Sequence, residues 1–212
     1  MDKKKIALLG GTGQTGKEFL TQSLAKGYQL KALVRTPAKV TETSPNLEVI
    51  VGDVLNPGDV QQTVAGTDLV VSLFGHVKGS PKWLQTTGTE NILAAMREHQ
   101  VPRIISLSGG GLPYEKDQPK FPDKAIRFIM KLAVPKMLND AVRHAEVLKK
   151  SDVAWTIVRG PRLTNEPKKG DYRIGWVGVN AGTKLGRADL ADFILRLVEH
   201  NEYDGQMPFV SY

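Results

Sequence analysis

The glycine-rich stretch Gly10–Gly16 is the feature that most limits how this chain can fold. It follows the apolar run Ile6–Leu9, which is typical of a parallel strand covered on both faces, and it precedes apolar residues at helical spacing in 19–24. A glycine turn between a buried strand and a helix leaves the first N–H groups of the helix free to bind phosphate. The stretch therefore predicts a strand, a turn and a helix that hold a phosphorylated ligand.

Three of the glycines have separate expected roles. Gly10 permits the tight turn, Gly13 lets a pyrophosphate approach the backbone, and Gly16 lets the helix pack close to the strand. Their spacing, G-x-x-G-x-x-G, differs by one residue from the common dinucleotide fingerprint G-x-G-x-x-G. The predicted cofactor-binding residues of this turn are Gly10, Thr12, Gly13, Gln14, Thr15 and Gly16.

A triphosphate-binding loop is an alternative interpretation of the same residues. Gly11, Gly16 and Lys17 match the beginning of G-x-x-x-x-G-K-[ST], but Glu18 stands where a hydroxyl is needed. A carboxylate cannot take that role beside a triphosphate, so a kinase or ATPase is disfavoured. A glycine turn that binds no ligand is the other alternative.

The end of the second predicted strand, Leu30–Val34, indicates which dinucleotide is preferred. An acidic residue about 20 positions after the glycines binds the ribose 2′-hydroxyl of NAD, whereas an Arg accommodates the 2′-phosphate of NADP. Here the residue is Arg35, and Thr36 can donate a further hydrogen bond. We therefore expect NADP(H), with NAD(H) possible at lower preference; an Arg on a solvated loop is the alternative.

The ends of two further predicted strands contain candidate cofactor-binding residues. The strand 47–51 leads to Asp53, which could accept a hydrogen bond from adenine or cap the helix 57–64, and to Val54, which could cover the adenine ring. The strand 68–75 is long and apolar, and its carboxyl end should face the middle of the cofactor. The cofactor-binding residues predicted at that end are Leu73, Phe74 and Gly75, with His76 beside them.

The catalytic candidates lie farther along the chain. Ser108 ends the strand 103–108, where its hydroxyl could bond a nicotinamide carboxamide or a substrate. A hydrolase motif G-x-S-x-G around it is excluded, because Ser106 stands where glycine is required. After the strand 155–158, Pro161 stiffens a turn beside the nicotinamide end, and Arg162 follows where a substrate could lie.

The alternation of strands and helices predicts an α/β fold, a Rossmann-like doubly wound parallel sheet with helices on both faces, in one domain over 1–212. The segment 124–150 has a helical pattern broken at Pro135, and it should cross over with one face on the sheet. An additional strand over 172–179, a last helix over 188–200 and a closing strand over 207–210 complete the expected order.

Composition limits location and partners. The chain has no cysteine, so disulfides and thiol chemistry are excluded, and we expect no metal site. Its formal charge of +7 is spread in short clusters without interleaved aromatics, which disfavours nucleic acid. No signal segment or apolar run of about 20 residues is found, so we expect a cytoplasmic monomer without a membrane partner.

Taken together, these segments resemble the atypical short-chain dehydrogenase/reductase family, in the NAD(P)-binding NmrA-like group that includes biliverdin-IXβ and flavin reductases. The resemblance implies an NADPH-dependent reductase that passes hydride to a flavin or a tetrapyrrole-like acceptor. A non-catalytic NADP(H) sensor of the NmrA type is the alternative. The matching segments are Gly10–Gly16, Leu33–Arg35, Val51–Leu55, Thr63–Gly66, Arg187–Ala191 and Glu202–Gly205.

Two departures narrow the expected chemistry. The Tyr-x-x-x-Lys pair of typical short-chain dehydrogenases is missing, since Gln118 follows Tyr114 and Trp176 follows Tyr172 at that spacing. Ordinary carbonyl reduction is therefore disfavoured. Arg162 stands where the family's tetrapyrrole reductase has a histidine, which weakens the case for biliverdin but would suit an anionic acceptor.

Overall fold

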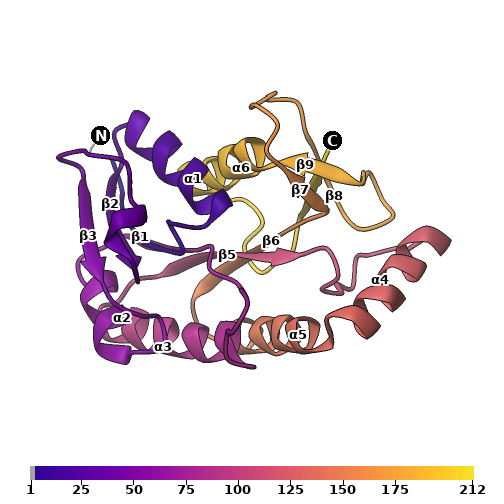
Figure 1. Ribbon diagram of the computed structural model, residues 1–212, viewed down its shortest axis with the longest axis horizontal. Coiled ribbons are helices and arrows are strands. Elements are labelled where there is room, and N and C mark those ends of the chain that lie inside the picture. Colours follow the sequence, from indigo (N-terminus) through magenta and orange to yellow (C-terminus); the bar gives the residue numbers. More distant parts are fainter. Residues whose placement is uncertain (1–2) are drawn as a thin grey trace.

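The computed structural model describes residues 3–212 and is built on a sheet of eight strands (Figure 1). Their spatial order is β3-β2-β1-β4-β5-β6-β10-β8, and only β8 runs antiparallel to its neighbour. This order confirms the predicted doubly wound fold. The strands are β1 (Lys5–Leu9), β2 (Gln29–Val34), β3 (Leu47–Val51), β4 (Leu69–Ser72), β5 (Arg103–Gly109), β6 (Ala154–Gly160), β8 (Arg173–Gly175) and β10 (Phe209–Ser211).

Helices cover both faces of the sheet, as Figure 1 shows. Two of them, α1 (Gln14–Ala25) and α6 (Arg187–Glu199), pack on one face. The opposite face carries α2 (Pro57–Val64), α3 (Leu84–Glu98) and α5 (Pro135–Lys149). Because both faces are covered, the central strands are continuous apolar runs rather than alternating ones.

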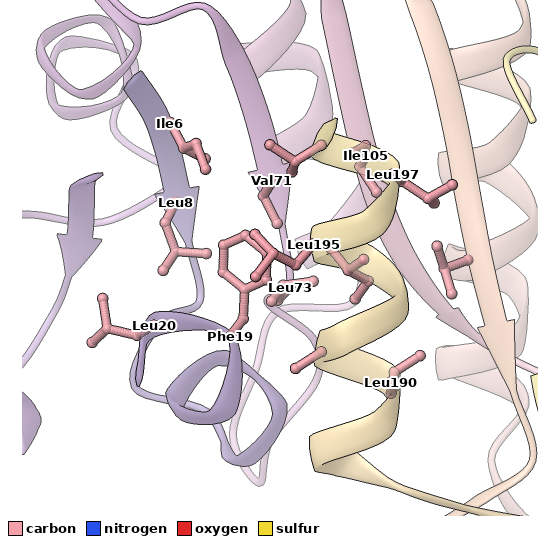
Figure 2. Packing of buried hydrophobic residues seen from close by; sticks show 14 of the residues in the cluster. Ile6, Leu8, Phe19, Leu20, Val71, Leu73, Ile105, Leu190, Leu195 and Leu197 are labelled. Atoms are coloured by element: carbon pink, nitrogen blue, oxygen red, sulfur yellow. The ribbon is translucent and has the colours of Figure 1, made fainter. Parts of the chain in front are cut away.

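The core under α1 and α6 fixes where the glycine turn lies. Phe19 of α1 and Phe193 of α6 are fully buried, and Figure 2 shows Phe19 lying close to Leu73 and Leu195. Each such side chain contributes about 1.5–3 kcal/mol of hydrophobic stabilisation relative to an exposed one. The start of α1 is thereby held against the carboxyl ends of β1 and β4.

Two parts of the expected order are wrong in detail. The helical pattern does break at Pro135, but only α5 lies on the sheet; α4 (Phe121–Ala133) extends away from it at one end of the molecule (Figure 1). The expected strand 172–179 is cut to β8, because Gly178 has φ +82° and the chain turns there. A small separate sheet, β7 (Arg162–Thr164) and β9 (Lys184–Gly186), was not expected.

Candidate functional site

The turn after β1 requires glycine at two positions. Gly10 has φ +91°, and a Cβ there would overlap the backbone nitrogen of Phe74. A Cβ on Gly16 would overlap the carbonyl oxygen of Gly10, so α1 can approach β1 only because that side chain is absent. The Gly13 N–H donates to the Gly10 carbonyl at 3.0 Å and closes the turn. The expected roles of Gly10 and Gly16 agree with this geometry.

A cavity of about 320 Å³, here called the glycine-turn cavity, opens at the carboxyl ends of β1, β2 and β4. This is the edge at which parallel α/β sheets bind ligands. Nine of the predicted cofactor-binding residues line it, from several segments that are distant in sequence. They are Gly10, Thr12, Gly13, Arg35, Asp53, Val54, Leu73, Phe74 and Gly75.

Six of the predicted cofactor-binding residues do not line this cavity, and two of them, Ser108 and Pro161, belong to the next cavity described below. Gln14, Thr15 and Gly16 form the first turn of α1, where Thr15 and Gly16 are buried, so their contribution is to the position of the helix. Thr36 precedes the short 3-10 turn Pro37–Lys39 and is exposed. Their backbone or hydroxyl contacts with a cofactor stay predictions.

The basic end of the glycine-turn cavity is formed by Arg35 and Lys39. Within residues 3–212 neither side chain forms an ion pair or a side-chain hydrogen bond. Two free cations at the end of β2 suit an added phosphate more than a free ribose hydroxyl. The 3-10 turn Pro37–Lys39 brings Lys39 to the same end of the cavity as Arg35.

Asp53 had two expected roles, and the structure removes one of them. The cap of α2 is Asn56, whose side-chain oxygen accepts the Gly58 N–H at 3.0 Å. Asp53 instead accepts the Leu55 N–H at 2.9 Å, and its own N–H donates to Asp59. The capping alternative is therefore wrong, and the second carboxylate oxygen of Asp53, which lines the cavity, accepts no hydrogen bond within residues 3–212.

A second cavity of about 260 Å³, here called the Ser108 cavity, continues from the first. The segment Leu73–His76 lines both, so the two form one path around the end of β4. Most of the other lining is apolar, and includes Leu107, Leu112 and Met137. Within residues 3–212 the buried Ser108 hydroxyl has no hydrogen-bond partner, which leaves it free for a ligand. Pro161 also lines this cavity.

His76 is held rigidly at the junction of the two cavities. Its Nε2 lies 2.6 Å from the Asp140 carboxylate, which is fully buried. Asp140 also accepts the Gln85 and Thr86 N–H groups in the first turn of α3, at 2.8 and 3.0 Å. The carboxylate accepts these bonds at the N-terminal end of α3 and orients the imidazole so that Nε2 donates to it.

Another buried histidine, His144, ties the same region together. Its Nδ1 lies 2.8 Å from the Thr89 hydroxyl of α3, and its Nε2 lies 3.1 Å from the Ser106 hydroxyl of β5. Burial lowers the pKa of His144 to about 4, although the charge of Asp140 acts in the opposite direction. His144 is therefore neutral near pH 7 and joins α5 to α3 and β5. Within residues 3–212 no three acidic or histidine side chains are grouped to hold a metal ion.

The wall of the Ser108 cavity is fixed by a buried ion pair. Arg159 of β6 is fully buried and binds both carboxylate oxygens of Asp117 at 2.8 Å. The same guanidinium donates to the carbonyl oxygens of Leu112 and Met207. Bidentate pairs of this kind are geometrically specific. The loop after β5 is thus held in one position beside Pro161.

Arg162 lies outside the Ser108 cavity and lines a third, of about 410 Å³, here called the two-arginine cavity. The second arginine is Arg127 of α4, whose buried Nε has no partner within residues 3–212. Gly109 and Pro161 line both this cavity and the Ser108 cavity, so the two are adjacent. The structure therefore separates Ser108 from Arg162, and brings Arg162 and Arg127 to the same cavity.

The sequence analysis missed Asp140 and Arg127 and gave His76 no assigned role. A signal for Asp140 exists: it lies four residues before His144, so both fall on the apolar stripe of α5 that includes Leu138 and Ala141. A buried acidic residue on such a stripe needs a partner. Arg127 had no signal, because helical spacing alone does not tell which face of α4 meets the protein.

Comparison with known proteins concerns the family and the fold of the chain. A family model described as NAD(P)H-binding matches residues 10–201. An uncharacterized chloroplastic protein of Arabidopsis thaliana is 29% identical over 177 residues, or 79% of this chain. The matched region spans 62% of the length of the Arabidopsis protein.

Two solved structures have the same fold at low sequence identity. A short-chain dehydrogenase/reductase of Veillonella parvula, in complex with NADP, has a TM-score of 0.82 at 19% identity, covering 100% of this chain and 95% of that one. ChuY, an anaerobillin reductase of Escherichia coli O157:H7, has a TM-score of 0.80 at 17% identity, covering 98% and 96%. At such identities the similarity concerns the fold alone.

Proposed function

Because the chain belongs to the NAD(P)H-binding family, we propose that it is an NADPH-dependent reductase that transfers hydride to a flavin or a similar flat conjugated acceptor. One observation carries this proposal: Leu73–His76 lines both the glycine-turn cavity and the Ser108 cavity. A dinucleotide whose pyrophosphate lay at Gly13 would bring its nicotinamide end toward the apolar cavity beyond β4. That cavity would then receive the acceptor.

The residues present fit a phosphorylated dinucleotide. The backbone at Gly10 and Gly13 leaves room for the pyrophosphate, and the Ser108 hydroxyl lacks a partner that a carboxamide would provide. Arg35 and Lys39 would hold the 2′-phosphate and favour NADPH over NADH. When bound, NADPH supplies the hydride.

The protein's own contribution would be orientation and exclusion of water. The lining of the Ser108 cavity has three polar side chains, His76, Gln85 and Ser108, among apolar residues and glycines. The Asp140 carboxylate keeps a proton on His76 Nε2 and holds the ring edge still between the cavities. Such an arrangement suits hydride transfer to a conjugated ring, which asks little proton transfer of the enzyme.

The two-arginine cavity favours an acceptor that carries an anionic group. It adjoins the Ser108 cavity at Gly109 and Pro161, so a ring in the Ser108 cavity could extend an anionic group toward Arg162 and Arg127. A flavin phosphate and a propionate both fit that description. The shared fold with ChuY, an anaerobillin reductase, is a reason to test bilins beside flavins.

The test is NADPH oxidation, followed optically, with FMN, riboflavin or biliverdin as acceptor and NADH in parallel. Turnover with FMN or riboflavin and a preference for NADPH is the expected result. Tight NADPH binding without turnover on any acceptor would contradict the proposed reductase and favour a non-catalytic NADP(H) sensor. Absence of NADPH binding would contradict both functions.

A further inference from the structure

Helix α4 carries its large apolar side chains on the outside of the molecule. No residue within Phe121–Ala133 is buried, and the exposed fractions are 85% for Phe121, 70% for Leu132 and 63% for Phe128. Ile126 and Ile129 are more than half exposed as well. Contiguous exposed apolar patches of this kind mark interaction surfaces rather than ordinary solvated helix faces.

The side of α4 that meets the protein is the less apolar one. Its half-buried residues are Asp123, Arg127 and Met130, which form one stripe at helical spacing that Val134 continues directly after the helix. Met130 and Arg127 on this stripe line the cavities described above. The usual arrangement of a surface helix, apolar inside and polar outside, is therefore reversed in α4.

The same segment is strongly basic. Residues 120–136 contain five basic residues and one acidic residue, Asp123, which accepts the Lys120 N–H at 2.9 Å. In the part of the chain that the structure describes, none of the four lysines forms an ion pair. Lys124 and Lys131 follow one edge of the apolar face of α4, while Lys120 precedes the helix and Lys136 lies in the first turn of α5.

We propose that α4 docks on an anionic lipid surface, with its apolar face in the bilayer interface and its lysines against the head groups. Charge complementarity selects this occupant. A second copy of the chain on the same face would bring like charges together, and a neutral surface would leave the lysines without partners. No membrane partner was expected from the sequence because it has no apolar run of about 20 residues, a criterion for spanning segments that does not detect one exposed apolar helix face.

The proposed contact is peripheral. Within residues 3–212 none of the helices combines the length and the apolar character that crossing a bilayer requires. Because α4 also lines the Ser108 and two-arginine cavities, docking would bring lipid close to both. The inference does not depend on the proposed reductase activity, since it rests on exposure and charge alone.

The experiment is co-sedimentation of the full chain with phosphatidylcholine vesicles, with and without phosphatidylglycerol. We expect binding to the anionic vesicles only, weakened by salt. The double variant Phe128→Glu with Leu132→Glu should lower the bound fraction about ten-fold, and so should Lys124→Glu with Lys131→Glu. The matched control is Val51→Glu, since Val51 is 61% exposed on the edge strand β3, and it should bind like the unaltered chain.

Three results would overturn the proposal. They are no sedimentation with anionic vesicles, equal binding to neutral vesicles, and equal loss of binding in the Val51→Glu control. Concentration-dependent dimers that the Phe128→Glu and Leu132→Glu changes abolish would assign the face to a second copy instead. Circular dichroism and NADPH titration establish that each variant is folded, so a loss of vesicle binding reports on the surface.

Discussion

The two ends of the proposed site are built in different ways. The glycine-turn end rests on backbone geometry between β1 and α1, inside a core in which Phe19 is fully buried. The two-arginine end rests on side chains from α4 and β7, and no residue of α4 is buried. A single Cβ at Gly10 or Gly16 disrupts the first end, whereas Arg162 and Arg127 of the second end can be exchanged without a backbone clash. We infer that the first end is constrained for one ligand and the second is adaptable.

The largest expected effect tests the backbone constraint. Gly16→Ala should lower NADPH affinity roughly 100-fold, because the added Cβ overlaps the Gly10 carbonyl and moves the turn. Gly109→Ala is the matched change at the other end, where a Cβ meets nothing within 4 Å, so the turn stays in place and any change in NADPH affinity should be far smaller. Isothermal titration measures both. Equal losses would contradict the difference between the two ends.

The stability of the region around His144, which joins α5 to α3 and β5, should depend on pH. Burial lowers the pKa of His144 to about 4 in the folded protein, against about 6.5 when unfolded, so protonation favours unfolding. The free energy of unfolding should therefore be highest, as far as His144 is concerned, above pH 6.5. It should fall by about 3 kcal/mol as the pH decreases toward 4. Urea unfolding between pH 7 and about pH 4 measures it.

Substitution separates His144 from other groups that titrate in the same range. His144→Gln should flatten the pH dependence of unfolding, while lowering stability at neutral pH because the Thr89 and Ser106 hydroxyls lose their partner. His99→Gln is the control, since His99 bonds Gln61 of α2 rather than Thr89 or Ser106. This variant should show the same pH dependence of unfolding as the unaltered chain. An unchanged slope in His144→Gln would show that other groups cause it.

Arg35→Asp tests the preference for NADPH at the glycine-turn end. Loss of a charge-assisted bond to the 2′-phosphate should cost about 1.5–3 kcal/mol, or roughly 10- to 100-fold in NADPH affinity. NADH affinity should stay the same or rise, because a carboxylate suits the free hydroxyl. Arg97→Asp on α3, whose side chain is 70% exposed, is the charge control. Unaltered NADPH affinity would exclude Arg35 as the phosphate ligand.

The strand, turn and helix of the glycine-turn end could be predicted from the sequence because their determinants are local. Strand, turn and helix follow one another within about 20 residues, and Arg35 lies directly after β2. The other end depends on contacts between distant segments, such as His76 with Asp140 and Asp117 with Arg159. Hydrophobic periodicity predicts the type of an element but does not predict which distant side chains it contacts.

The element boundaries show the same division. β1, β3 and α2 agree with the pattern to within one residue, since apolar runs define the two strands and Asn56 and Pro57 define the start of α2. β7 and β9 have three residues each and are strands only because they pair with each other. For α4 the spacing predicted a helix correctly. It could not show that the apolar side faces outward, because the orientation of α4 depends on how its side chains pack beside Gly109–Gly111 and Pro161.

His76→Gln tests the junction between the ends. The ring held by Asp140 lines both cavities, so its loss should lower kcat about ten-fold, less than a direct proton donor would cost, while NADPH affinity changes little. Asp140→Asn should have a similar effect on kcat if the pair acts as a unit. A fall in NADPH affinity equal to the fall in kcat would instead indicate a general distortion of the Leu73–His76 segment.

The smallest expected effect belongs to the two-arginine end. Arg162→Gln should raise the KM for FMN by about five-fold, because a partly solvated ion pair contributes up to about 1 kcal/mol. Riboflavin lacks the phosphate, so its KM should not change, and it serves as the control within each variant.

Arg127→Gln should act in the same direction, and the double variant should add little more if either arginine alone can hold the phosphate. A raised KM for both flavins would mean that Arg162 shapes the Ser108 cavity rather than binding an anionic group. Because the side chain is exposed and the backbone of β7 is unaltered, a stability change large enough to explain either result is not expected.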